Sequence, residues 1–214
     1  MITKTQIIKI NTEFIDFDKI ENISQVLVNN GVIAYPTDTF YGFGVKCYSP
    51  EAIRRICHIK KRKELKPIPV FIADLDEIKD IAEEIPASFS SISKEFWPGP
   101  LTLVLKASSR LPEELTGLSG AIGIRLPDIP WLRELIRKAK FPITATSANI
   151  SGEKEITQAE KVIGTFMGKV DLIIDGGKAP GTKPSTVVDL TSEKPRILRK
   201  GAVSEERLQK YLEI

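Results

Sequence analysis

Apolar residues recur every three or four positions in several parts of the chain, which is the spacing of one face of an α-helix. In the first such stretch, residues 17–30, the apolar positions are Ile20, Ile23, Val26 and Leu27. Gly31 follows and predicts the end of this helix. A second helix is predicted from Ser49, whose hydroxyl can cap it, through Pro50 to about residue 61. Further helices are predicted at 75–85, 87–96, 129–140, 157–166 and 204–212.

Short apolar runs bounded by Gly, Pro or polar residues lie between these helices and are typical of buried β-strands. They occur at 32–35, 68–72, 101–105, 121–126, 143–145, 172–174, 186–190 and 196–198. Helices and strands alternate, with several direct steps from strand to strand. This order predicts a mixed α/β (α+β) fold in which a largely continuous, twisted open sheet carries helices on its faces. We find no repeat and no long linker, so a single domain over residues 1–214 is predicted.

The composition changes this picture little, but it excludes several classes of protein. With 214 residues, 42% hydrophobic and 28% charged, the chain is typical of a globular protein with a full core. No apolar run approaches the roughly 18 residues of a membrane span, and residues 1–11 lack the apolar core of a secretion signal. Two cysteines, Cys47 and Cys57, are too few for a disulfide scaffold. We therefore expect a cytoplasmic protein without membrane association.

Charge and histidine content limit the chemistry. The net charge of +3 permits anionic ligands but does not by itself indicate a nucleic-acid-binding protein. His58 is the single histidine, which excludes His-rich metal sites and mechanisms that need two histidines.

The segment Pro36-Thr37-Asp38-Thr39-Phe40-Tyr41-Gly42 directly follows a predicted strand and holds two hydroxyls, a carboxylate and a phenol. Ligands of open sheets bind at strand ends, so these side chains are candidates for a binding site. The alternative is a capped turn, in which Thr and Asp satisfy local backbone groups. The sequence leaves both interpretations open.

A run of cations, Lys60-Lys61-Arg62-Lys63, ends the second predicted helix, and Lys66 follows shortly after. Cations at a helix C-terminus often do no more than complement its dipole on a solvated face. Here Pro67 and Pro69 fix the chain just after the run, which favours a cluster aimed at one point. Such a cluster suits a polyphosphate, because Arg binds it bidentately and Lys adds point charge.

Two further segments combine small and hydroxyl-bearing residues at strand ends. Residues 144–152, with Ser147 and Asn149, form a loop whose small side chains let backbone amides approach a ligand. Ser185 enters a later strand, and Arg199 ends the strand after it. Ordinary loops have the same composition, so neither segment is specific alone.

Arg125 is a charge inside the otherwise apolar strand 121–126. A buried Arg is usually paired, and its partner is either a structural carboxylate or that of a ligand. Two glycine-rich stretches carry no nucleotide motif. Gly176 and Gly181 have P-loop spacing without the following Lys-Ser/Thr pair, and Gly42-Phe43-Gly44 lacks the third glycine of a dinucleotide fingerprint.

Taken together and in this order, these segments resemble the YrdC family, and within it the short members that make threonylcarbamoyl-AMP. The resemblance covers about residues 20–201. Its blocks are 32–44, Lys60-x-Arg62 with Lys66-Pro67, 96–103, 123–127, 147–152, and 185–190 with 197–199. Longer members carry a C-terminal domain, and the expectation is that this chain ends before one.

The resemblance implies a fold and a reaction. The fold is a YrdC-like twisted open sheet with flanking helices around a basic concave cavity. The reaction is nucleotidyl transfer, in which L-threonine, bicarbonate and ATP with Mg²⁺ give threonylcarbamoyl-adenylate and pyrophosphate. The product feeds formation of threonylcarbamoyladenosine in tRNA, which implies partner proteins that transfer the group and possible contact with tRNA or other RNA.

The resemblance also implies roles for single residues, position by position. ATP contacts fall on Lys60, Arg62, Lys66, Ser147, Asn149 and Arg199. L-Threonine contacts fall on Thr37, Thr39, Tyr41, Arg125 and Ser185. Lys60 and Arg62 take the catalytic role by neutralising the triphosphate, while the metal ligands stay unknown. Several members have His where this chain has Phe71, so that polar contact is absent or replaced here.

Two alternative functions stay open. One is a YrdC-like, carbamoyl-adenylating maturation factor of hydrogenases, although such proteins are much longer and carry zinc-finger and acylphosphatase segments. The other is a binding module for double-stranded RNA or tRNA. A net charge of +3 makes high affinity for RNA at physiological salt a poor expectation.

Overall fold

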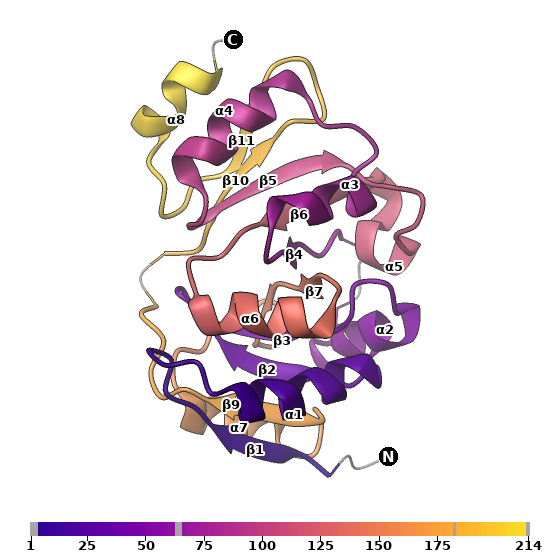
Figure 1. Cartoon of the computed structure of the whole chain (residues 1–214), viewed down its shortest axis with the longest axis vertical. Helices are drawn as coiled ribbons and strands as arrows, with labels where there is room; N and C mark the ends of the chain where they lie inside the picture. Colours follow the sequence, from indigo (N-terminus) through magenta and orange to yellow (C-terminus); the bar gives the residue numbers. More distant parts are fainter. Residues whose placement is uncertain (1–3, 63–65, 182, 213–214) are drawn as a thin grey trace.

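The structure is a computed structural model that describes residues 4–62, 66–181 and 183–212. Its strands form two sheets, which occupy the lower and upper halves of the molecule in Figure 1. The first sheet has the order β1 (Gln6–Lys9), β9 (Leu172–Asp175), β2 (Ile33–Pro36), β3 (Tyr41–Gly44) and β8 (Thr146–Ser147). The second has the order β11 (Arg196–Arg199), β10 (Thr186–Asp189), β5 (Leu101–Lys106), β6 (Ala121–Arg125), β4 (Val70–Phe71) and β7 (Ile143–Thr144).

Helices flank both sheets. Around the first sheet in Figure 1 lie α1 (Phe17–Val28), α2 (Pro50–Ile59), α6 (Pro130–Ala139) and α7 (Ala159–Phe166). Around the second lie α3 (Ile78–Ile81), α4 (Ala87–Phe96), α5 (Glu113–Thr116) and α8 (Glu205–Leu212). Two 3₁₀ turns, η1 (Leu75–Glu77) and η2 (Gly117–Ser119), adjoin α3 and α5.

The first sheet is buried on both faces because its strands alternate between two apolar layers. Ile33 and Tyr35 of β2 pack with α1 and α6, whereas Ala34 between them packs in the larger core that includes α2 and α7. Successive side chains of a strand point to opposite faces, so this short apolar run serves both layers.

Along β5, helices cover one face of the second sheet, whereas at the other end of the sheet Phe71 of β4 and Ile143 of β7 also pack in the layer that contains α6. Leu101, Leu103 and Leu105 of β5 are fully buried in the core shared with α4 and α8. The alternate positions Thr102 and Val104 line cavities on the other face. Successive side chains of β5 therefore alternate between the core and the face of the sheet that lines the cavities.

One short stretch of chain joins the two sheets. β7 pairs with β4 in the second sheet, and β8, after one intervening residue, pairs with β3 in the first. Thr144 is fully buried at this crossing, where its hydroxyl donates to Phe43 O (3.2 Å) and its carbonyl accepts from the Tyr35 hydroxyl (2.8 Å). The crossing holds the sheets at the distance that leaves a cavity between them.

The mixed α/β class with flanking helices, predicted from the sequence, is confirmed. The continuous sheet is not observed, because residues 143–147 leave one sheet and enter the other. The helix expected over 75–85 ends at Ile81, since Ala82 adopts an extended conformation. The sequence did not indicate β1, β3, β8 or α5, which have four or fewer residues.

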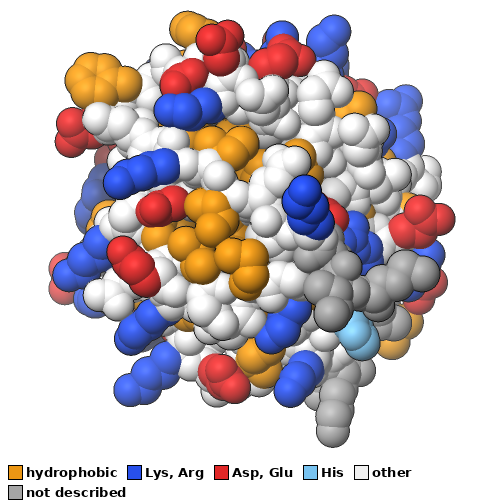
Figure 2. All heavy atoms as spheres, turned by 90° about the horizontal axis from the view of Figure 1, so that it is seen from below, with side chains coloured by type: hydrophobic (Ala, Val, Ile, Leu, Met, Phe, Trp, Pro, Cys, Tyr) orange, Lys and Arg blue, Asp and Glu red, His pale blue; other side chains and the backbone are white. Residues whose placement is uncertain are grey.

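The distribution of charge on the surface indicates which kinds of partner it could attract. In Figure 2, which views the molecule from below Figure 1, Lys and Arg side chains lie among Asp and Glu, with hydrophobic side chains exposed near the middle. This face therefore carries no extended surface of one charge.

Within the described residues, no helix is both long enough and apolar enough to cross a membrane.

Phe43 connects the inter-sheet region with the core, so its removal should destabilise the whole fold. Its side chain is fully buried, and its ring packs edge-on against Phe166 with centroids 4.8 Å apart. Phe43→Ala should lower the free energy of unfolding by about 3–5 kcal/mol, measured by urea denaturation. Phe14→Ala is the control, because Phe14 is 68% exposed and its loss should change stability by less than about 0.5 kcal/mol. Equal effects of the two substitutions would contradict this packing.

Candidate functional site

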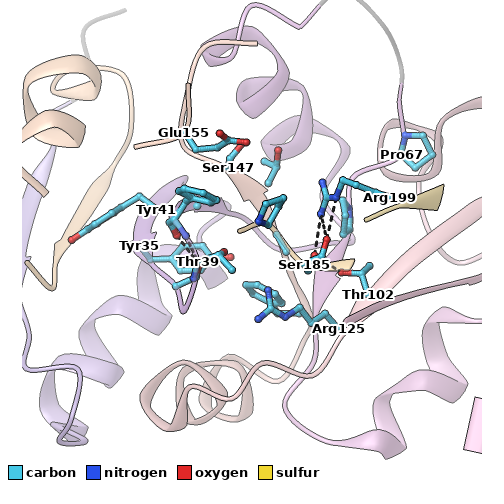
Figure 3. Close-up of a pocket in the computed structure, with 18 of the residues that line it drawn as sticks. Tyr35, Thr39, Tyr41, Pro67, Thr102, Arg125, Ser147, Glu155, Ser185 and Arg199 are labelled. Atoms are coloured by element: carbon cyan, nitrogen blue, oxygen red, sulfur yellow. Dashed lines mark hydrogen bonds between the residues drawn. The ribbon is translucent and has the colours of Figure 1, made fainter. Parts of the chain in front are cut away.

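The central cavity lies between the two sheets and has a volume of about 300 Å³. Figure 3 shows Thr39 and Tyr41 on one side of it and Ser185 and Arg199 on the other, with Arg125 below Ser185. The residues predicted from the sequence that line it are Thr37, Thr39, Tyr41, Arg62, Arg125, Ser147, Ser185 and Arg199. Six separate segments of the chain thus converge on one space.

A second cavity, the cationic cavity, adjoins the central one and measures about 580 Å³. Its lining includes Lys60, Lys66 and Asn149, the predicted residues that do not reach the central cavity. Arg62 and Ser147 line both cavities and so mark the passage between them. Lys63, the last cation of the run, lies outside the described residues.

A third cavity, the apolar cavity, covers the open face of the second sheet and measures about 600 Å³. It shares Pro67, Pro69 and Thr102 with the central cavity, and Val104 and Val187 form part of its floor. The sequence analysis did not single it out, because an alternating strand does not reveal that one of its faces lacks a covering helix.

The turn between β2 and β3 is a capped turn that also forms a wall of the central cavity, so the capping interpretation is confirmed and the binding-site interpretation stays a prediction. The Thr37 hydroxyl donates to Phe40 O (2.6 Å) and accepts from the backbone N–H of Thr39 (3.1 Å) and of Phe40 (3.2 Å). The Thr39 hydroxyl lies 3.0 Å from that of Thr37. These bonds fix the turn so that both threonines line the central cavity.

The Tyr41 side chain is held by the segment that follows β9. Its hydroxyl donates to Gly177 O (2.9 Å) and accepts from Gly176 N–H (3.2 Å). Burial raises the pKa of Tyr41 to about 12, so the phenol stays protonated at neutral pH. Tyr41 therefore shapes the wall of the cavity and is a poor acid or base.

Arg125 is buried, with 4% of its side chain exposed, and it is partnered. One terminal N–H donates to Asp38 Oδ2, and Nε–H donates to Gly99 O (2.8 Å). The Phe71 ring lies with its centroid 5.4 Å from the guanidinium carbon. Burial lowers the pKa of Arg125 and the Asp38 carboxylate opposes that shift. Of the five N–H groups of a guanidinium, three remain for a ligand.

Lys60 has a different place from the one expected of a triphosphate contact. Its ammonium donates to Asn149 O (3.0 Å), to Asn149 Oδ1 (3.0 Å) and to Ser147 O. Only 4% of the residue is exposed, and burial, followed by the charge of Arg62, lowers its pKa to about 8. All three N–H donors are engaged, so in this structure Lys60 braces the loop that follows β8.

That loop is organised around Asn149, which is also buried. Its Oδ1 accepts from the Ser147 hydroxyl (2.6 Å) as well as from Lys60, and its Nδ2 donates to Glu153 O (2.6 Å). Both polar atoms of the Asn149 side chain are therefore bonded within the protein. Ser147 keeps its place on the wall shared by the central and cationic cavities.

Arg199 and Ser185 form one unit on the opposite wall. The guanidinium of Arg199 donates to Ser185 O (2.9 and 3.1 Å) and to Ser185 Oγ (3.0 Å). The Ser185 hydroxyl also lies 2.9 Å from that of Thr102. Burial lowers the pKa of Arg199, and the nearby Glu155 carboxylate opposes the shift.

Arg62, just after α2, is bonded to the backbone of the segment that follows it in the chain. One terminal N–H group donates to Lys66 O (2.9 Å) and makes a longer contact with Pro67 O (3.4 Å). The side chain is half-buried on the wall of both cavities. A guanidinium held in this way presents its remaining donors to an anion.

Two carboxylates near the site were not among the residues assigned to ATP or L-threonine, although Asp38 belongs to the candidate segment 36–42. Glu155 lines the central cavity among three arginines, and Asp38 is bonded to one of them. Glu155 lies in a charged loop without a recognisable motif, so no sequence signal indicated it. The described residues contain no group of three or more His, Cys, Asp or Glu that could hold a metal ion.

Comparison with known proteins gives a consistent set of relatives. The family Sua5_yciO_yrdC, described as telomere recombination, matches residues 25–201. A threonylcarbamoyl-AMP synthase of Pyrococcus abyssi is 39% identical over 85% of this chain, and one of Bacillus subtilis is 34% identical over 98%. The crystal structure of P. abyssi Sua5 complexed with L-threonine matches with a TM-score of 0.92 and 37% identity, over 97% of this chain and 61% of that one. The chain spans 53% and 61% of the length of the two synthases.

Replacing Lys60 should loosen the loop around Asn149. Lys60→Met keeps the length of the side chain but removes one donor from each of three oxygens, which should lower the free energy of unfolding by about 1–3 kcal/mol. Lys61→Met is the control, since Lys61 is exposed and its loss should cost less than about 0.5 kcal/mol. Identical denaturation curves for the two variants would contradict the bracing role.

The lowered pKa of Lys60 adds a pH signature. Between about 8, its value in the folded protein, and the ordinary value of 10.5, the unfolded chain binds more protons than the folded one. The free energy of unfolding of the wild type, relative to that of Lys60→Met, should therefore rise with pH across this window. A difference that does not change with pH would show that the pKa is not lowered.

Proposed function

The chain belongs to the Sua5/YciO/YrdC family, and from that membership and the geometry of the central cavity we propose that it is a threonylcarbamoyl-AMP synthase. It joins L-threonine, bicarbonate and ATP into threonylcarbamoyl-adenylate and releases pyrophosphate. As a nucleotidyltransferase, it acts on the α-phosphorus of ATP.

One observation carries this proposal. A buried arginine with unused donors, Arg125, faces the same small cavity as the turn that bears Thr39 and as two further arginines, Arg62 and Arg199. An amino-acid carboxylate needs a cation and a hydroxyl-lined pocket, and a nucleotide needs several cations within reach. Both sets of groups meet here, in a chain similar to a Sua5 that was crystallised with L-threonine.

In the proposed arrangement the amino acid occupies the central cavity. Its carboxylate accepts from the free N–H groups of Arg125, and its side chain lies between Thr39 and Ser185. The amine then projects towards Arg62 and Ser147, where bicarbonate and the phosphates meet. This placement brings the reacting groups together without a nucleophile from the protein.

The chemistry balances with substrate groups alone. The ammonium group of threonine first loses one proton to solvent, and the free amine attacks the carbon of bicarbonate, so that carbamate forms with loss of water. A carbamate oxygen then attacks the α-phosphorus of ATP, and the bond to the pyrophosphate oxygen breaks. The protein supplies positive charge for the triphosphate from Arg62 and Lys66, on the wall of the cationic cavity.

ATP is too large for the 300 Å³ of the central cavity alone. We therefore place ATP across all three cavities, since the central cavity shares lining residues with each of the other two. The adenosine part lies on the apolar floor formed by Val104 and Val187, and the leaving pyrophosphate lies in the cationic cavity. Arg199, on the wall of the central cavity, is then near the α-phosphate.

Mg²⁺ enters this proposal as part of the ATP complex. The ion commonly keeps several waters and takes only one or two carboxylates in addition to phosphate oxygens. Glu155 is the carboxylate on the wall of the central cavity that would hold it, so the residues fit a metal brought by the substrate. When bound, Mg²⁺ supplies neutralisation of the phosphate charge.

Several wider roles stay proposals. The adenylate product is labile, so a partner enzyme that transfers its threonylcarbamoyl group to tRNA is expected nearby, and a cytoplasmic location fits that role. An RNA-binding function is the weaker candidate, because the net charge is small and the face in Figure 2 mixes both signs. A maturation-factor role would require carbamoyl phosphate as the donor, which the assay below separates.

The test of the proposed function is a pyrophosphate-release assay with the purified protein. Release should require ATP, Mg²⁺, L-threonine and bicarbonate together, and mass spectrometry should detect the adenylate. Carbamoyl phosphate should not replace threonine with bicarbonate. If pyrophosphate is released at an equal rate after removal of bicarbonate, or after removal of threonine, the proposed function is wrong.

Arg62 should contribute to ATP binding much more than to stability. Arg62→Ala should raise the KM for ATP about tenfold, because a charge-assisted contact to phosphate is lost. Its melting temperature should stay close to that of the wild type, since partly exposed cations contribute about 0–1 kcal/mol to stability. Arg54→Ala, on the exposed face of α2, is the matched control. Normal ATP kinetics in Arg62→Ala would indicate that the cations after α2 only complement the helix dipole on a solvated surface.

Arg125 should govern threonine affinity. Arg125→Ala should weaken threonine binding roughly ten- to a hundred-fold, because the charge-assisted bonds to the carboxylate are lost. Calorimetry with threonine, and separately with a non-hydrolysable ATP analogue, measures the two affinities. ATP affinity without threonine should change much less. Intact threonine binding in a folded variant would mean that Arg125 is only the partner of Asp38.

A further inference from the structure

The ion pair between Asp38 and Arg125 joins two segments that are far apart in the chain. Asp38 belongs to the turn between β2 and β3 of the first sheet, and Arg125 ends β6 of the second. The Arg125 side chain is 4% exposed and that of Asp38 is 24% exposed. The pair thus crosses from one sheet to the other beside the central cavity.

The bonds of Asp38 are unlike those of a carboxylate that serves only to stabilise the fold. Oδ2 accepts from Arg125, but Oδ1 is buried and has no hydrogen-bond partner. A buried pair already loses much of its Coulomb energy to desolvation, and an unsatisfied oxygen adds a further cost. A half-satisfied carboxylate at this place points to a role other than stability.

Two hydrogen bonds hold the guanidinium of Arg125: one fixes the position of its inner end, and the other fixes the rotation of its plane. The bond from Nε to Gly99 O anchors the inner end of the group. The bond to Asp38 holds a terminal nitrogen and so fixes rotation of the plane over the Phe71 ring. Without Asp38, the terminal N–H groups are free to turn away from the cavity.

From this geometry we propose that Asp38 is a positioning residue, which orients Arg125 so that its unused N–H groups receive the carboxylate of the amino-acid substrate. This inference rests on the proposed function, because it takes an amino acid as the ligand of the central cavity. Asp38 itself does not line that cavity, so its effect passes through Arg125. The rigid turn built on Thr37 keeps Asp38 in place while the ligand binds.

The experiment compares two substitutions of Asp38 in the pyrophosphate-release assay. Asp38→Ala removes the acceptor and should raise the KM for threonine about tenfold, which is the effect of one misdirected charge-assisted contact. Asp38→Asn keeps an oxygen that accepts from Arg125, so its KM for threonine should stay within about threefold of the wild type. The KM for ATP, and kcat at saturating threonine, should change less than about twofold in both, since neither contact involves the nucleotide.

A double variant tests whether the effect passes through Arg125. In an Arg125→Ala background, Asp38→Ala should leave the KM for threonine nearly unchanged, because the group that Asp38 orients is absent. Asp74→Ala is the matched control, since it removes a carboxylate that pairs with Arg137 on α6, away from the cavity. It should alter neither KM.

Several results would overturn the proposal. They are a folded Asp38→Ala protein with an unchanged KM for threonine, an equal rise in the KM values for threonine and ATP, and full additivity with Arg125→Ala. If Asp38→Ala does not fold, Asp38→Ser takes its place, and failure of both would make the pair a requirement of the fold. If the wild type releases no pyrophosphate with threonine, the proposed function fails, which is distinct from failure of the role of Asp38.

Discussion

Burial of one guanidinium constrains the architecture around the site. Arg125 lies in a strand whose neighbours are apolar, and a charge in that position needs partners. They come from three separate parts of the chain: Asp38 from the first sheet, Gly99 from the turn before β5, and the Phe71 ring from β4. The two sheets and the turn before β5 must therefore keep a fixed relation around Arg125, and the central cavity is the space that this relation leaves.

A second buried cation has a parallel role on the other side of the cavity. Lys60, at the end of α2, donates to Ser147 O and to two oxygens of Asn149, so it holds the loop after β8. Lys60 is thus bonded with all three of its donors, whereas Arg62, Arg125 and Arg199 make their bonds to the protein with only part of theirs. Lys60 shapes the cavity, and the partly bonded arginines are available to an anionic ligand.

The sequence predicts much of the fold and only part of the site. Long periodic stretches such as 17–30 and 87–96 are helices in the structure, because their apolar stripes need a core to cover them. Strands β1, β3 and β8 are too short or too polar to give a pattern of their own, and the division into two sheets depends on the crossing at 143–147. The resemblance to a known family identified residues that converge on the cavities, such as Thr39, Ser147 and Arg199. It did not indicate that Lys60 is bonded within the protein or that Asp38 holds Arg125, because both depend on contacts between segments far apart in the chain.

The most direct test of this account is a crystal structure of the protein with L-threonine and a non-hydrolysable ATP analogue bound together. The account predicts the threonine carboxylate on the free N–H groups of Arg125, with Asp38 still bonded to that guanidinium. It also predicts the triphosphate against Arg62 and Lys66, and the adenosine on the apolar face of the second sheet. Threonine bound elsewhere, with Arg125 in contact only with Asp38 and Gly99, would contradict it.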